Sequence, residues 1–187
     1  MNLGDVLNSF NLKKADAEQI EGIFTKKISL SNGDYFVKDG QVVGGIGFIK
    51  KGACRFFYNR KGDEFTRWVS FEGEFITSLA SFLYQKPAYE NIQAIRDTEI
   101  LFAERKAWYD LFEKNEVMRG LWLKTLEELY VDLEHRVFRF LTLNAEERYR
   151  WMFENQPNFI NQVPDKYLAQ MLGITPRHLT RLRSKRI

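Results

Sequence analysis

The last eleven residues of the sequence carry five cationic side chains and no acidic one. Arg177 and Arg181 stand four residues apart, so a helix would place both on one face. An arginine side chain can donate paired hydrogen bonds to guanine in the major groove of DNA, and arginine or lysine can neutralise a backbone phosphate. These residue types at this spacing could therefore recognise a polyanion if the chain holds them on a rigid element.

The distribution of charge supports this reading. From Asp165 to Ile187 there are six Lys/Arg and one Asp, a net charge of +5. The whole chain carries only +3, so residues 1–164 carry about −2. Positive charge concentrated at one end is typical of nucleic-acid-binding elements. A short basic tail can also be only a solvated surface, so charge alone does not decide the function.

The element that would position these cations reads as two short helices joined by a tight turn. Counted from Asp165, the fifth residue is Ala169, where the second helix would cross too closely for a larger side chain. The ninth is Gly173, where the turn needs a backbone angle that glycine adopts most cheaply. Thr175 would cap the second helix, and Pro176 would occupy its first position. The apolar residues that would hold the helices together are Leu168, Leu172, Ile174, Leu179 and Leu182.

An ordinary helical hairpin would explain this apolar pattern, but not the Ala and Gly placement together with a basic outer face. We therefore predict a helix-turn-helix that binds double-stranded DNA. Lys185 and Arg186 lie beyond the reading surface and are assigned to phosphates. His178 is interpreted as a contact residue, because no second metal ligand lies nearby. The predicted DNA-binding residues are Thr175, Arg177, His178, Thr180, Arg181, Arg183, Lys185 and Arg186.

The residue pattern before this element changes twice, from helical to β-rich and back to helical. Asp16 to Phe24 reads as a short helix with Asp16 as its cap. From Thr25 to about Glu104, seven or eight β-rich runs alternate with turn signals such as SNGD and FEGE. No helix long enough for a crossover interrupts them, so we expect an antiparallel sandwich or jelly-roll barrel, with a short helix at Ser78 to Lys86.

After Arg105 the pattern is helical, with a short amphipathic helix and then a long one from Glu116 to about Leu143. The apolar stripe of the long helix is Met118, Trp122, Leu126, Leu129, Leu133, Val137 and Phe140. A helix of this length with a wide apolar face favours pairing with the same helix of a second subunit. The alternative is that it lies wholly on its own domain.

Three regions follow from these patterns: a sensor barrel at 1–105, a helical connector and dimerisation helix at 106–143, and a DNA-binding region at 144–187. Asn144 is expected to cap a helix that ends at Pro157. The segment NFINQV after Pro157 reads as a short extended link. The predicted fold class is α+β.

This order of elements resembles the Crp/Fnr family of bacterial transcription regulators. The turn FEGEF at residues 71–75 resembles the Gly-Glu of the family's phosphate cassette, and LAQMLGITPRHLTRLR at 168–183 resembles its recognition motif. The resemblance implies a cyclic-nucleotide-binding-like jelly roll, a dimerising helix, a winged helix-turn-helix, and RNA polymerase as a partner. Because the sequence ends soon after the second helix, we expect the wing to be absent or reduced.

The resemblance also places a ligand site in the barrel, at Gly73, Glu74, Ala88, Tyr89 and Arg96. Family members that bind cyclic AMP grip its phosphate with an arginine and a small hydroxyl residue. Ala88 and Tyr89 stand at those positions, so we expect no cyclic-AMP response, because an unpaired phosphate is costly to bury. Glu74 could contact a ribose hydroxyl, and Arg96 could replace the missing arginine. The alternative is a regulator gated by an unidentified small ligand, or by a cyclic nucleotide at a divergent site, in the barrel.

Catalysis is not expected. The two histidines, His135 and His178, both lie outside the predicted barrel, so no metal-dependent jelly-roll enzyme, no metal and no cofactor is predicted. The single cysteine, Cys54, reads as a partly buried strand residue. The sequence has no membrane-spanning apolar run and no signal-peptide pattern at its start, so a cytoplasmic protein is expected.

Overall fold

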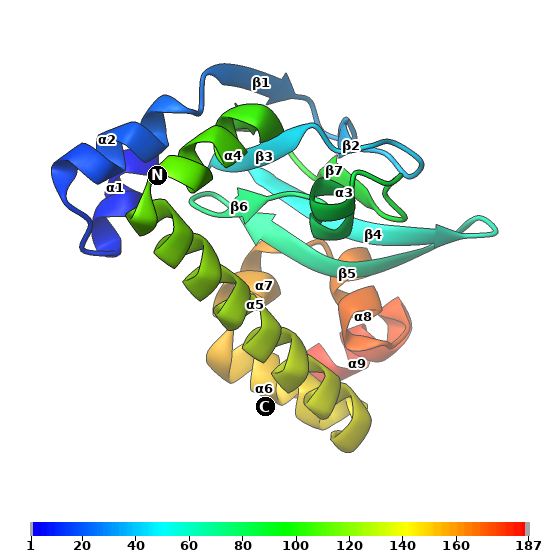
Figure 1. Cartoon of the computed structure of the whole chain (residues 1–187). Helices are drawn as coiled ribbons and strands as arrows, with labels where there is room; N and C mark the ends of the chain where they lie inside the picture. Colours follow the sequence, from blue (N-terminus) through cyan, green and yellow to red (C-terminus); the bar gives the residue numbers. More distant parts are fainter. Residues whose placement is uncertain (1, 186–187) are drawn as a thin grey trace.

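A computed structural model describes residues 2–185 of the chain (Figure 1). Its β-rich part is two antiparallel four-stranded sheets packed face to face. The first sheet has the order β1 (Lys26–Leu30), β8 (Thr98–Glu104), β3 (Gly45–Lys51) and β6 (Phe75–Ile76). The second has the order β2 (Tyr35–Val37), β7 (Asn91–Ala94), β4 (Ala53–Arg60) and β5 (Asp63–Phe71). The predicted antiparallel jelly roll is confirmed.

Alternation along the strands decides which side chains fill the barrel. On β4, Cys54 and Phe56 belong to the core between the sheets, whereas Ala53 belongs to a second core on the outer face. Phe48 of β3 is fully buried and lies 5.3 Å from the ring of Phe75, measured between centroids. Phe75 belongs to β6, a two-residue strand too short to show as a periodic pattern.

Two short helices precede the barrel, α1 (Leu3–Ser9) and α2 (Lys14–Gly22). The sequence pattern predicted only the second. The prediction that Asp16 caps it is wrong, because α2 begins at Lys14 and Asp16 lies inside its first turn. An acidic side chain there still interacts favourably with the helix dipole.

The remaining barrel helices agree with the expected positions: α3 (Leu79–Tyr84), α4 (Arg105–Lys114) and α5 (Glu116–Thr142). Asn115 caps α5, and its Oδ1 accepts a hydrogen bond from the backbone N–H of Met118 at 2.8 Å. In Figure 1, α5 runs from the N-terminal helices to the C-terminal ones and so links the two parts of the molecule. Among residues 2–185, no helix is long and apolar enough to cross a membrane.

The C-terminal part consists of α6 (Ala145–Asn155), α7 (Pro157–Gln162), α8 (Asp165–Leu172) and α9 (Pro176–Ser184). The predicted cap at Asn144 is confirmed, and together with Glu147 it forms a capping box. The prediction of an extended link after Pro157 is wrong. Pro157 occupies the first turn of α7, where its missing N–H costs nothing, so the residue that stops one helix starts another.

The C-terminal helices pack on the outer face of the second sheet, as seen for α7 and α8 beneath β5 in Figure 1. Phe159 of α7 lies 4.8 Å from Trp68 and 5.3 Å from Phe71, ring to ring. One hydrophobic cluster therefore joins strand residues such as Val69 with the core of the C-terminal helices. The two parts are coupled through apolar packing as well as through α5.

Candidate nucleic-acid interface and ligand cavity

The turn between α8 and α9 has the geometry that the sequence pattern requires. Gly173 has φ 67° and ψ 35°, the left-handed conformation that glycine adopts without strain. The fully buried Ala169 accepts at its carbonyl a 3.0 Å hydrogen bond from the N–H of Ile174. Thr175 caps α9, and its Oγ1 accepts a hydrogen bond from the N–H of His178 at 3.2 Å. The two helices form a helix-turn-helix.

The end of α5 packs directly on this turn. A side chain added at Gly173 would place its Cβ 2.7 Å from Cζ of Phe140, which is closer than van der Waals contact allows. Glycine is thus required at this position both for its backbone angle and for the close approach of a neighbouring ring. The turn and the long helix fix one another's position.

The outer face of α9 is cationic, and its members differ in what they contact. Leu179 and Leu182 are buried, whereas Arg177, Thr180 and Arg181 are exposed. Among the described residues, neither Arg177 nor Arg181 has an ion-pair partner within 4.0 Å, so both guanidinium groups are available to a ligand.

Two further predicted contact residues are engaged within the protein. Arg183 forms an ion pair with Oδ1 of Asp165 at 2.8 Å and donates a hydrogen bond to the carbonyl of Ile160 at 3.1 Å, which ties α9 to α8 and α7. Lys185 pairs with Oε2 of Glu146 at 2.9 Å. Arg183 stays a predicted DNA contact, and its guanidinium also holds the helices together. Arg186 lies outside the described residues.

A cavity of about 470 Å³ lies between the barrel and α5. Among its lining residues are Arg67, Trp68, Glu74, Trp122, Arg136 and Arg139. Glu74 lines this cavity. Loss of hydration through partial burial raises the pKa of its carboxyl, although hydrogen bonds from Ser70 and from the backbone of Phe71 oppose the shift. The site therefore combines apolar walls with three arginines and three carboxyl groups, Glu74, Glu128 and Asp132, of which Glu74 has a raised pKa.

Comparison with known proteins found a matching domain model and structures with a similar fold. Residues 27–115 match the family model described as the cyclic nucleotide-binding domain. A CooA mutant from Carboxydothermus hydrogenoformans is similar in structure, with a TM-score of 0.72 and 18% identity over 99% of this chain and 84% of that one. The c-di-GMP-responsive global regulator CLP from Xanthomonas campestris has a TM-score of 0.70 and 15% identity over 90% of both chains. No match was found among curated proteins.

A third similar structure is a putative transcriptional regulator of the Crp/Fnr family from Eubacterium rectale, with a TM-score of 0.68 and 14% identity over 95% of this chain and 84% of that one. Residues 27–115 thus match the cyclic nucleotide-binding domain, and the chain shares the fold of these three structures. Identities this low establish the fold of the whole chain and leave its activity to be argued from its own residues.

The residues expected to bind a ligand in the cyclic nucleotide-binding domain do not come together. Ala88 is buried and exchanges backbone hydrogen bonds with the turn at Gly40 and Gln41. Tyr89 is 62% exposed and stacks on Tyr58, with ring centroids 5.9 Å apart. Arg96 donates to Oε1 of Gln162 on α7 at 2.9 Å.

Of the five expected ligand-site residues, Glu74 lines the cavity. Gly73, with φ 91°, shapes the turn before Glu74, and its N–H donates to the carbonyl of Ile49 at 2.8 Å. The prediction that Arg96 replaces the missing arginine is therefore wrong, because its side chain bonds to Gln162 of α7 and does not line the cavity. The cations at the cavity are Arg67, Arg136 and Arg139, which sequence reasoning missed. Arg136 and Arg139 gave one usable signal, since they stand three residues apart on a predicted helix.

The apolar stripe predicted for dimerisation divides into two parts. Met118 is fully buried, and the ring of Trp122 lies 5.2 Å from that of Trp108 in the barrel core. The prediction that Met118 and Trp122 contact a second subunit is wrong, because the barrel of the same chain covers both. Leu126 is half-buried at the cavity. The exposed members of the stripe are Leu129, Leu133, Val137 and Phe140, with exposed fractions of 49–53%.

Cys54 is buried on β4, where burial raises the pKa of its thiol to about 12. At neutral pH it is therefore a protonated core side chain, in agreement with the sequence interpretation. Gln170 on α8 was not singled out by any pattern, yet it connects the two parts of the molecule. Its Oε1 accepts from the backbone N–H of Thr66 at 3.2 Å and from the Thr66 hydroxyl at 2.6 Å.

Proposed function

We propose that this protein is a sequence-specific DNA-binding transcription regulator of the Crp/Fnr type, and not an enzyme. The observation that carries the proposal is the exposed pair Arg177 and Arg181 on the second helix of a helix-turn-helix. Their spacing of four residues aims both guanidinium groups outward while Leu179 and Leu182 hold the helix down. Arginine side chains so placed can read guanine in the major groove.

The protein acts as a homodimer in this proposal. Leu129, Leu133 and Val137 leave an apolar row exposed on one helix, which a second copy of the same helix would cover by an isologous contact. A two-fold dimer would read two half-sites about one helical turn of DNA apart. RNA polymerase as a further partner, and the cytoplasm as the site of action, follow only from the likeness to Crp/Fnr regulators.

The proposed regulator does not respond to cyclic AMP or cyclic GMP. No cation stands at Ala88 or Tyr89 to balance a cyclic phosphate, and Glu90 beside them is already paired with Arg67 at 2.7 Å. Burying a phosphate without a partner would be unfavourable. Calorimetry with either nucleotide should show no binding in the micromolar range, and a micromolar dissociation constant for one of them would refute this part of the proposal.

The test of DNA reading begins by selecting bound sequences from random duplexes with the purified protein. Arg181→Ala is then titrated against the selected site and a scrambled duplex at two salt concentrations. Loss of a paired arginine–guanine contact should weaken binding to the selected site by about 1–3 kcal/mol and leave the scrambled duplex nearly unaffected. The matched control is Arg60→Ala, which removes an exposed arginine at the end of β4 and should change neither affinity.

Lys185 offers a second comparison within the same experiment. If it contacts a phosphate, Lys185→Ala should weaken both duplexes equally and reduce the salt dependence by about one charge. An equal loss on both duplexes for Arg181→Ala would make that residue a phosphate contact as well. No loss on either duplex for Arg177→Ala and Arg181→Ala together would refute the helix-turn-helix as the DNA-binding surface.

A further inference from the structure

Three helix ends meet beside the turn of the helix-turn-helix. The chain reverses direction at Leu143 and Asn144, between the end of α5 and the start of α6, and α8 ends at Leu172 next to this elbow. The last carbonyl groups of a helix have no partner within the helix and carry partial negative charge. An elbow that brings two such helix ends together is therefore stabilised by a positively charged donor.

Arg148 supplies this donor from α6. Its Nε donates a hydrogen bond to the carbonyl of Leu172 at 3.1 Å, and its Nη1 donates one to the carbonyl of Leu143 at 2.5 Å. The guanidinium carbon also lies 4.7 Å from the centroid of the Phe140 ring. One half-buried side chain thus connects the ends of α5 and α8.

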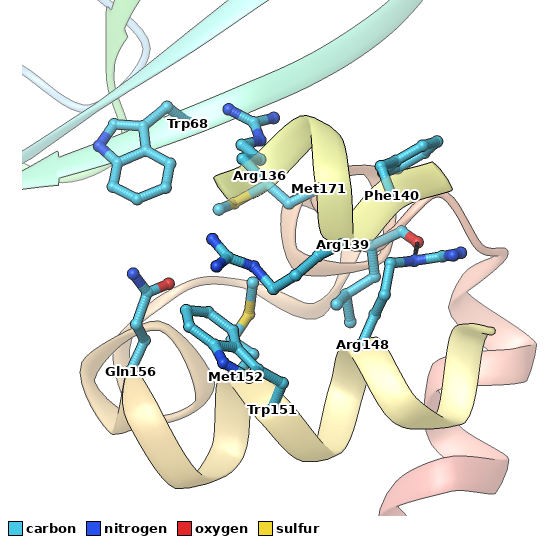
Figure 2. Close-up of a pocket in the computed structure, with 10 residues that line it drawn as sticks. Trp68, Arg136, Arg139, Phe140, Arg148, Trp151, Met152, Gln156 and Met171 are labelled. Atoms are coloured by element: carbon cyan, nitrogen blue, oxygen red, sulfur yellow. Dashed lines mark hydrogen bonds between the residues drawn. The ribbon is translucent and has the colours of Figure 1, made fainter. Parts of the chain in front are cut away.

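The last turns of α5 add two aromatic contacts to the same elbow. Phe140 contacts both Arg148 and the turn, since a Cβ at Gly173 would come within 2.7 Å of its ring. Arg139, the preceding residue, lies over the ring of Trp151 of α6 at 3.6 Å. Figure 2 shows Arg139 above Trp151, with Arg148 extending from α6 toward the end of α5. The end of α5 therefore contacts both α6 and the turn.

The contacts between the C-terminal helices and the barrel have a different character. Apolar packing joins these helices to the sheet, and Gln170 accepts two hydrogen bonds from Thr66, at a β-bulge where the register shifts between Phe56 and Phe57. Apolar attraction has no preferred direction, and both of these bonds end on one rotatable glutamine side chain. The bonds of Arg148 end on main-chain carbonyls of two helices and depend on their angle. We therefore assign the angle between α5 and the helix-turn-helix to the elbow.

We propose that Arg148 is the positioning residue that sets the spacing of the two DNA half-sites. The inference rests on the proposed function, DNA reading by a dimer paired through α5. In such a dimer, the angle at the elbow determines how far apart the two copies of α9 lie. One base pair added between the half-sites moves them apart by roughly 3.4 Å and turns them by roughly 34°. A fixed elbow cannot follow this change, whereas a loosened elbow can.

Affinities for a series of three duplexes provide the test: the selected duplex, and the same duplex with one base pair removed or added between its half-sites. The wild-type protein should bind both altered duplexes about tenfold or more weakly than the selected one. Arg148→Gln should bind all three within about threefold of one another. Arg148→Lys keeps the charge but not the planar fork of donors, so it should retain part of the discrimination.

The matched control is Arg150→Gln on the same helix. Arg150 is exposed and lies 3.6 Å from Glu146, so its loss should leave the spacing preference of the wild type. Circular dichroism establishes that each variant is folded. A smaller folded fraction would weaken binding to every duplex by the same factor, so the ratio between duplexes reports the elbow and not the stability.

A second measurement needs no DNA. Because Cys54 is buried, a cysteine placed at the exposed Ser184, at the end of α9, can carry a spin label by itself. Electron–electron resonance between the two subunits should give a narrow distance distribution, which Arg148→Gln should widen. An unchanged spacing preference in Arg148→Gln, or an equally narrow distribution, overturns the inference alone. A wild-type protein that selects no duplex would contradict the proposed function itself, and the inference with it.

Discussion

The first half of α5 buries its apolar stripe in the barrel, whereas the second half leaves the continuation of that stripe exposed. Met118 is completely buried, and Leu133, four turns further along, is 53% exposed. The same residue types at the same spacing thus have different surroundings. Helical periodicity shows which face will be covered but not what covers it. The barrel covers the first half, and in our proposal a second copy of the chain covers the other.

The largest effect is expected from Met118→Ala. The substitution leaves a cavity between α5 and the barrel core, and it should lower the free energy of unfolding by about 2–5 kcal/mol. Leu123→Ala on the same helix is the control, since Leu123 is 59% exposed and should cost less than about 0.5 kcal/mol. Urea denaturation followed by circular dichroism measures both. Equal losses would contradict the division of α5 into a covered half and an open half.

The next effect concerns the exposed half. Leu129→Glu should place an unpaired charge in the proposed helix–helix contact and weaken the dimer by several kcal/mol, on the order of 3. The monomer should remain folded, because Leu129 is 49% exposed within its own chain. Light scattering together with circular dichroism separates the two outcomes. A dimer that stays intact after Leu129→Glu and Leu133→Glu would place the interface elsewhere.

A smaller effect is expected where α5 ends against the helix-turn-helix. Gly173→Ala should destabilise the protein by about 1–3 kcal/mol, since alanine at φ 67° is strained and its Cβ would lie 2.7 Å from Phe140 Cζ. Adding Phe140→Ala removes the steric clash and should leave about 1 kcal/mol of backbone strain. Thermal unfolding of the two single variants and the double variant measures this coupling. Strict additivity would mean that Phe140 does not restrain the turn.

The smallest effect is expected at Glu74, which faces the cavity. Its folded-state pKa is raised, so the folded protein binds a proton there more tightly than the unfolded chain does. The carboxyl therefore favours folding below its ordinary pKa of 4.5, and this contribution is lost as the pH rises through the folded value. Glu74→Gln should stabilise the protein at neutral pH by less than about 1 kcal/mol, because water reaches the group. Denaturation curves should show that the gain disappears in acid, and a gain independent of pH would rule out this cause.

The sequence predicted elements whose signals are local. Asn144, Thr175 and Gly173 act through their own backbone neighbours, so their positions could be read from residue type and spacing. Pro157 was misread because proline both follows helices and begins them, and only the packing of Phe159 on the sheet decides between the two. The site was harder to predict than the fold.

The position of Arg67 depends on a bulge and on Glu90, a residue 23 positions away in the sequence. Neither the bulge nor the contact with Glu90 produces a periodic pattern in the sequence. Arg136 belongs to the polar face of a predicted helix, where a charged residue is ordinarily only solvated. Only the tertiary structure shows that β5 brings Arg67 close to Arg136, because the two residues lie far apart in the sequence.

The bulge in β5 has a consequence for measuring motion in this protein. Because the register shifts at this point, the amide of Thr66 donates to Gln170 of α8, and the buried Thr66 is shielded where the C-terminal helices pack on the sheet. Its proton should exchange with deuterated solvent whenever α8 lifts from the barrel, without any opening of the barrel itself. The exchange rate of the Thr66 amide thus reports how often the C-terminal helices separate from the barrel. If this amide exchanges faster than the amides of β3, then the two parts separate more often than the whole protein unfolds.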